Sequence, residues 1–221
     1  MNNIYGIICS FIFVAAVLGL STLLSKRGII RGEGSRKLIH IGVCNWWIIA
    51  MVFYDNPFYA ALVPAVFIAV NYMSYKKQLI KAMERNGGKK DLGTVYYAVS
   101  LFILALLSFG PDGEPYIGAI GILVMGYGDG IAAIIGERLG RIPFGPKKSG
   151  KTLEGTIGMF LASFIVVFMI MSIFSDISPL WVSLAIALYG AVAELYTPNG
   201  FDNLTVPLGT AFLYTIIASA V

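Results

Sequence analysis

The chain has 221 residues, of which 57% are hydrophobic and only 13% are charged, and its formal net charge is +4. Soluble domains carry about a quarter charged residues, so this composition excludes an ordinary globular protein and also a disordered one. The basic excess does not indicate a nucleic-acid partner, because lysine and arginine in membrane proteins chiefly set the orientation of the chain. We therefore expect an integral membrane protein that binds no nucleic acid.

Apolar runs predict an all-α, multi-pass fold with about eight transmembrane helices, and the shorter runs are compatible with seven to nine. Eight helices of about 20 residues use about 160 positions, which leaves no room for a soluble domain. Residues 1–221 are therefore expected to form a single membrane-embedded catalytic domain. In chain order, the predicted spans are 4–24, 38–54, 57–74, 93–110, 115–137, 153–174, 179–196 and 204–221.

The basic residues predict which connections face the cytoplasm. All 16 of them fall in three alternate loops, near 25–37, 75–92 and 138–152, and Arg36 and Lys37 are counted in the first. By the positive-inside rule these loops are cytoplasmic. With eight spans, the connection near 197–203 is cytoplasmic as well, and the N-terminus is expected outside.

Asp129 is the clearest candidate for a functional residue within a span. It lies in the segment Gly-Tyr-Gly-Asp-Gly that ends at Gly130, inside an apolar run. An ionisable group in the membrane is costly and is by default functional, and the glycines allow a ligand or another backbone to approach closely. A metal or ion ligand is one interpretation of Asp129, and a partner of a lysine or arginine that fixes helix packing is the other.

A glycine-rich, lysine-rich segment precedes the sixth predicted span. Residues 145–152 fit the P-loop pattern G-x-x-x-x-G-K-S/T, but an apolar helix precedes them where a P-loop needs a β-strand, so we reject a P-loop fold. The segment still leads into a helix N-terminus, whose dipole and free N–H groups attract phosphate. The alternative is a loop that only sets orientation, although such a loop needs neither the glycines nor Ser149 and Thr152.

Four further residues near the cytoplasmic ends of spans carry possible site chemistry. Glu154, in the first turn of the sixth span, either shares a divalent cation with a bound phosphate or complements the helix dipole. Glu194 and Asp202 supply hard oxygen ligands of the kind that Mg²⁺ accepts, although turn chemistry also explains Asp202. His40, the only histidine, is either a base or a packing residue.

These residues share one end of the molecule under the topology that the charges predict. Carboxylates, lysines and a helix N-terminus are together the components of a Mg²⁺–nucleotide site for phosphoryl transfer. A site in the cytoplasmic half of the membrane indicates that the second reactant is a lipid.

The same residues resemble the polyprenol kinase family, which includes dolichol, phytol and farnesol kinases and the CTP-dependent diacylglycerol kinase of fungi. The resemblance implies an integral membrane kinase that transfers phosphate from CTP, with Mg²⁺, to a lipid alcohol such as a polyprenol, phytol, farnesol or diacylglycerol. The matching segments are residues 36–40, 128–136 with Gly140, 147–155 and 202–207.

The resemblance and the residue chemistry together give a set of expected roles. The alcohol enters from the bilayer and the nucleotide from the cytoplasm, and either Asp202 or His40 is the base. The expected metal ligands are Asp129 and Asp202, with Glu154 or Glu194 as further ligands. The expected catalytic residues are Asp129, Lys148, Lys151, Asp202 and His40. The expected nucleotide-binding residues are Gly128, Gly130, Lys147, Lys148, Ser149, Lys151, Thr152, Gly155 and Asn203.

Two rival functions remain open at this point. Phosphatidate cytidylyltransferases share the middle of the pattern, but they usually end in two acids that flank an arginine, and the run Phe201-Asp-Asn has no arginine. A small ion or anion transporter with Asp129 on its path also fits a glycine-broken helix with a charge. Against the transporter, the chain shows no internal repeat and the lysine–glutamate segment would have no role.

Overall fold

The computed structural model describes residues 2–30, 33–77, 92–146, 150–198 and 200–220. In these ranges the chain is helical and forms no β-strand, only an isolated bridge between Pro143 and Thr152. The elements are α1 (Asn3–Lys26), α2 (Glu33–Cys44), α3 (Trp46–Phe53), α4 (Pro57–Lys77), α5 (Gly93–Ser108), α6 (Pro115–Leu123), the π-helix η2 (Val124–Asp129), α7 (Gly130–Leu139), α8 (Leu153–Phe174), α9 (Pro179–Tyr196) and α10 (Asp202–Ser219).

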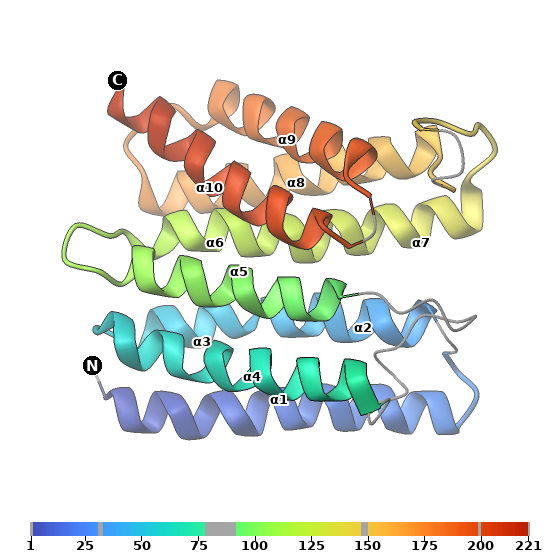
Figure 1. Ribbon diagram of the computed structural model, residues 1–221. Helices are drawn as coiled ribbons and strands as arrows, with labels where there is room; N and C mark the ends of the chain where they lie inside the picture. Colours follow the sequence, from blue (N-terminus) through green and yellow to red (C-terminus); the bar gives the residue numbers. More distant parts are fainter. Residues whose placement is uncertain (1, 31–32, 78–91, 147–149, 199, 221) are drawn as a thin grey trace.

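The helices form eight passes, because α2 with α3 and α6 with η2 and α7 each make one near-continuous rod (Figure 1). Within the described residues, six passes are long and apolar enough to cross a membrane. The other two are α5, with 16 residues, and α10, with 18. The predicted all-α, multi-pass membrane fold is confirmed.

The helix ends that border the four connections predicted to be cytoplasmic lie at one end of the bundle, and the start of α1 and the end of α10 lie at the other (Figure 1). This arrangement agrees with the alternation of basic loops. Which end faces the cytoplasm stays a prediction. Residues 78–91, which hold most of the loop near 75–92, lie outside the described part of the chain.

One boundary prediction was wrong, and it concerns the site. Arg36 and Lys37 lie within α2 and not in a loop. The apolar run starts only at Leu38, so hydropathy alone placed the start of the helix too late. The first turns of α2 carry polar side chains because they face the protein interior, where Ser35 and Lys37 are buried.

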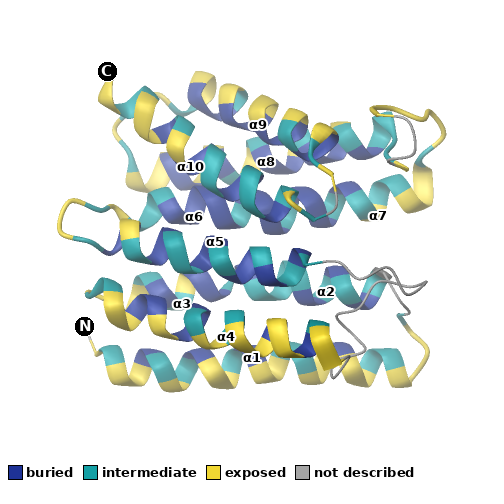
Figure 2. Ribbon diagram, viewed as in Figure 1, coloured by how far each residue is buried: buried dark blue, intermediate teal, exposed yellow. Residues whose placement is uncertain are grey.

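The rod of α6, η2 and α7 occupies the centre of the bundle, and α1 lies at its edge (Figure 2). In the most apolar stretch of the central rod, 67% of the residues are buried inside the protein. The corresponding share for α1 is 17%. Lipid-facing helices expose apolar side chains, because the bilayer solvates them. Asp129, in the middle of this rod, is only 8% exposed and is thus surrounded by protein.

Candidate active site

Asp129 is the last residue of η2, the π-helical turn that interrupts the central rod. Such turns are rare and occur frequently at functional sites. A Cβ at Gly126 would overlap Cys44, and one at Gly130 would overlap Ile41, both on α2. The predicted close approach at these two glycines therefore occurs, and the groups that approach them are side chains of α2.

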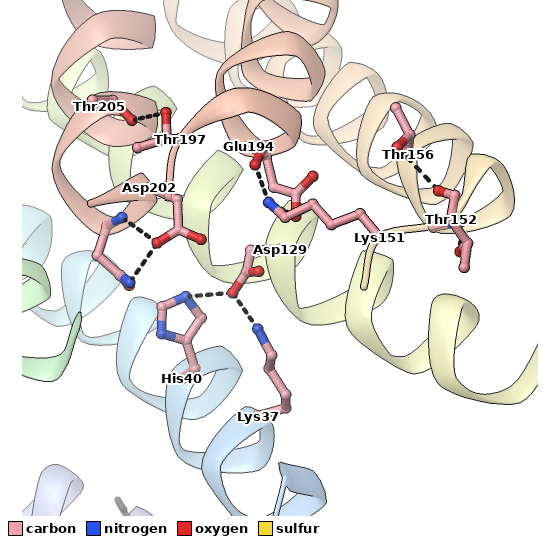
Figure 3. A network of polar contacts seen from close by, with 12 residues as sticks. Lys37, His40, Asp129, Lys151, Thr152, Thr156, Glu194, Thr197, Asp202 and Thr205 are labelled. Carbon is pink, nitrogen blue, oxygen red and sulfur yellow. Dashed lines mark hydrogen bonds and ion pairs between the residues drawn. The ribbon is translucent and has the colours of Figure 1, made fainter. Parts of the chain in front are cut away.

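Two residues of α2 meet the Asp129 carboxylate (Figure 3). Lys37 Nζ donates to Asp129 Oδ2 at 2.5 Å, and His40 Nε2 lies 3.5 Å from the same oxygen. The Lys37 and Asp129 side chains are only 6% and 11% exposed. Asp129 thus has the lysine partner that the packing interpretation expected. Buried charges are costly even when paired, so packing alone is a weak reason to retain this pair.

A second ion pair joins the glycine-rich segment to α9. Lys151 Nζ lies 2.6 Å from Glu194 Oε1, and it also donates to the Glu194 backbone carbonyl. The Glu194 side chain is 9% exposed and the Lys151 side chain 21%. The lysine predicted to hold phosphate is therefore next to a carboxylate predicted to hold metal.

Asp202 begins α10, and one of its two carboxylate oxygens accepts hydrogen bonds from described residues. The backbone N–H and the side-chain amide of Asn203 both donate to Asp202 Oδ1, each at 3.0 Å. This is the turn chemistry that the alternative interpretation expected. The other oxygen points away from Asn203, toward the space next to Asp129 (Figure 3).

The N-terminus of α8 differs from the prediction in two respects. Its N–H groups are not all free, because Gly155 N–H donates to Thr152 Oγ1 and Leu153 N–H to the Ile142 carbonyl. Glu154 Oε2 accepts from Ile142 N–H at 3.3 Å, so Glu154 holds the preceding loop. These local bonds compete with phosphate and metal, and what remains for an anion is chiefly the helix dipole.

A cavity of about 340 Å³ joins these groups. Among the described residues, its charged lining comprises four carboxylates and three cations, a net charge of −1, which favours the binding of a divalent cation. The charged residues are Asp129, Glu137, Glu194 and Asp202 with Arg36, Lys37 and Lys151. The neutral lining includes Thr152, Gly155, Thr156 and Asn203.

Seven of the residues predicted from sequence line the cavity: Asp129, Lys151, Thr152, Gly155, Glu194, Asp202 and Asn203. Among the other described residues, His40 and Glu154 are not part of the lining, and Gly128 and Gly130 act through helix packing. Lys147, Lys148 and Ser149 lie outside the described residues, so their roles stay predictions.

The described carboxylates that line the cavity are suitable ligands for Mg²⁺, but they do not surround a single point closely enough to enclose the ion. Within the described ranges no three Asp, Glu, His or Cys side chains stand close enough to enclose a metal. Mg²⁺ is usually held by one or two carboxylates, several waters and substrate phosphates. Asp129 and Asp202 fit that smaller role, and the metal assignment stays a prediction.

The resemblance covers residues 36–40, but the site residues expected from the sequence do not include Lys37 or Arg36. The positive-inside rule explains both residues as cations that set orientation. The available signal was spacing, because Lys37 and His40 are three residues apart and so share one face of a helix. A lysine on the same helix face as a candidate catalytic histidine is itself a candidate site residue.

Comparisons with known proteins add an independent line of evidence. No family model matches the chain, and no solved structure matches it. Over 209 residues it is 34% identical to a phytol kinase of Synechocystis sp., an alignment that covers 91% of this chain and 86% of the relative. It is 31% identical to phytol kinase 1, chloroplastic, of Arabidopsis thaliana, over 89% of this chain and 70% of that one.

These relatives are kinases, which decides against the cytidylyltransferase and the transporter as the protein's class. The alignment with the Synechocystis relative extends over about nine tenths of the chain. The chain therefore belongs to the phytol kinase group of the polyprenol kinase family and is a lipid-alcohol kinase.

Proposed function

We propose that this kinase transfers the terminal phosphoryl group of Mg–CTP to the hydroxyl of phytol or a closely related isoprenoid alcohol, at the cavity around Asp129. The main support for this proposal is one cavity, at the end of the bundle predicted to be cytoplasmic, whose lining includes Asp129, Asp202, Lys37 and Lys151. Phytol is taken from the names of the relatives, and CTP from the resemblance to the polyprenol kinases. The basic connections at this end support a cytoplasmic site.

In this proposal the nucleotide lies along the Lys151 side of the cavity. Lys151, the α8 dipole and, by sequence, Lys147 and Lys148 hold the triphosphate. Lys151 exchanges its contact with Glu194 for a phosphate oxygen. Thr152 and Thr156 line the same wall and offer hydroxyl donors.

Asp129 and Asp202 would hold the metal ion on the other side. Bound Mg²⁺ supplies charge neutralisation of the β- and γ-phosphate oxygens. Lys37 then lies next to the transferring group and stabilises charge that develops on it. Because this kind of transition state is loose, positioning contributes more than a strong base.

The transfer forms a bond between the alcohol oxygen and the γ-phosphorus and breaks the bond from that phosphorus to the bridging oxygen of CDP. The hydroxyl proton passes to His40 or Asp202. His40 Nε2 is suited to this, because in the described structure it has no hydrogen-bond partner and an unprotonated imidazole nitrogen is an acceptor.

The test is a matrix of donors and acceptors. Purified protein is incubated with Mg²⁺, each of CTP, ATP, GTP and UTP, and each of phytol, farnesol, undecaprenol and diacylglycerol. We expect phytyl phosphate and CDP in equal amounts. A preference for ATP would overturn the donor assignment, and phosphorylation of diacylglycerol alone would overturn the acceptor assignment.

A further inference from the structure

A second cavity adjoins the polar one along α2. Its volume is about 80 Å³, and α1, α2, α3, α4, α5 and the start of α10 enclose it. On α5 its lining extends from Gly93 to Leu101, eight residues or about 12 Å of helix. It is therefore narrow and long, and we call it the chain pocket. Its apolar lining is Val14, Leu18, Ile39, Val43, Trp46, Val63, Pro64, Phe67, Val70, Tyr97, Ala98 and Leu101.

Three polar atoms in the walls of the chain pocket make no hydrogen bond to the described residues, and one of them, His40 Nε2, lies within ion-pair distance of Asp129. Across the described residues, five buried side-chain polar atoms lack a hydrogen bond, and three of them are His40 Nε2, Asn71 Oδ1 and Tyr97 Oη. Asn71 and Tyr97 are 7% and 6% exposed. A buried unpaired polar group costs about 1–3 kcal/mol, and the hydrocarbon core offers no water to compensate. Asn71 Oδ1 and Tyr97 Oη, two such groups around one apolar pocket, indicate a ligand with a polar end.

His40 separates the chain pocket from the polar cavity. It lines the chain pocket, while its Nε2 lies 3.5 Å from Asp129 Oδ2, which lines the polar cavity. The Tyr97 ring packs against the imidazole, with centroids 4.4 Å apart. Arg36 and Asn203 line both spaces. A ligand in the chain pocket can thus place its polar end next to Asp129.

The chain pocket also meets the lipid-facing surface of the bundle. Val70, on α4, is 37% exposed and still lines the pocket. Leu18 of α1 and Phe67 of α4 are half-buried in the same wall. A hydrocarbon chain can therefore continue from the pocket into the bilayer between α1 and α4.

We propose that the chain pocket binds the reacting end of the alcohol, with the hydroxyl at His40 and Tyr97 and the first carbons along Val63 and Leu101. This assignment rests on the proposed function, because it takes the acceptor to be a membrane alcohol. The two substrates then approach by different routes, the nucleotide through the polar cavity and the alcohol from the bilayer. The narrow shape admits one hydrocarbon chain.

The test compares two identical substitutions on one helix. Val63 lines the chain pocket and is 2% exposed, whereas Val66 is 38% exposed on the same helix and lies outside the pocket lining. Val63→Phe should raise the KM for phytol at least about tenfold and leave the KM for CTP unchanged, because the added ring fills the pocket. Val66→Phe should leave both unchanged. Equal kinetics for the two variants would overturn the proposal.

Tyr97→Phe keeps the assay informative if Val63→Phe does not fold. The substitution preserves the ring and removes only the hydroxyl. One neutral hydrogen bond corresponds to about a 3- to 10-fold rise in the KM for phytol, with no change in the KM for CTP. Unchanged kinetics for phytol would remove Tyr97 from the site.

A photoreactive probe separates failure of this assignment from failure of the proposed function. A diazirine analogue of phytol, without nucleotide, should label the α5 segment that contains Tyr97 and Leu101. Labelling confined to lipid-facing residues, such as Leu161 on α8 and Leu188 on α9, would overturn the pocket assignment. Loss of the proposed function would instead appear as wild-type protein that phosphorylates no alcohol.

Discussion

The two lysine–carboxylate pairs have the same chemistry and different surroundings. Lys37 and Asp129 lie on helices that glycine contacts hold closely together, and the Lys37 side chain is only 6% exposed. Lys151 follows Gly150, which has a φ of +72° and, among the described residues, no atom within 4 Å of the position of a Cβ. The Lys151 side chain is 21% exposed. Moving the Lys151 side chain to a new partner therefore costs less free energy than moving the Lys37 side chain. The comparison suggests that the first pair positions the reacting group and that the second exchanges partners when nucleotide binds.

The largest effect is expected for Asp129→Asn. Loss of a charge aimed at the transferring group should lower kcat about 100- to 1000-fold. The substitution also leaves Lys37 buried without its carboxylate, which costs about 3–5 kcal/mol of stability. Phytyl phosphate formation and thermal unfolding measure the two effects separately.

The double variant Lys37→Met with Asp129→Asn is the control for this first prediction. It removes both charges, so the unfolding temperature should recover toward wild type while activity stays low. A fully active Asp129→Asn variant would contradict the assignment of Asp129. Recovery of activity in the double variant would show that the Lys37–Asp129 pair contributes to helix packing and not to catalysis.

A smaller effect is expected for Lys151→Gln. A charge-assisted contact is worth about 1.5–3 kcal/mol, so the KM for CTP should rise roughly 10- to 100-fold. A fall in kcat instead would indicate that Lys151 acts as charge develops in the transition state. Lys89→Gln, with the same charge change in the other basic loop, should have little effect. Equal, small losses in both variants would mean that the Lys147–Lys151 segment sets orientation only.

Glu194→Gln should have an intermediate effect and separates two roles of that carboxylate. If Glu194 only orients Lys151, the KM for CTP should rise about fivefold and the Mg²⁺ concentration for half-maximal activity should stay constant. If Glu194 binds the metal, the Mg²⁺ requirement should increase instead. A Mg²⁺ titration at saturating CTP distinguishes the two outcomes.

Glu154→Gln should have the smallest effect, about twofold or less in kcat/KM. Its carboxylate holds the Ile142 N–H and is not part of the cavity lining. The same Mg²⁺ titration serves as the check. A higher Mg²⁺ concentration for half-maximal activity in this variant would indicate that Glu154 is a metal ligand after all.

The sequence by itself determined the helical passes, the gathering of basic connections at one end, and Asp129 as the central charge. These follow from local properties, because hydropathy, loop charge and a glycine-rich segment are readable within about 20 residues. The family resemblance was also available from short motifs. Local patterns do not show which way a helix is turned about its own axis.

Only the tertiary structure decided which charges meet. Lys37 and Asp129 are 92 residues apart in the chain, and Lys151 and Glu194 are 43 apart. Their contacts depend on the rotation of α2 and α9 against the central rod, which close packing at small residues sets. The same packing turned Glu154 toward Ile142 and left His40 between the polar cavity and the chain pocket, because helix rotation is a property of the assembled bundle and not of any one segment.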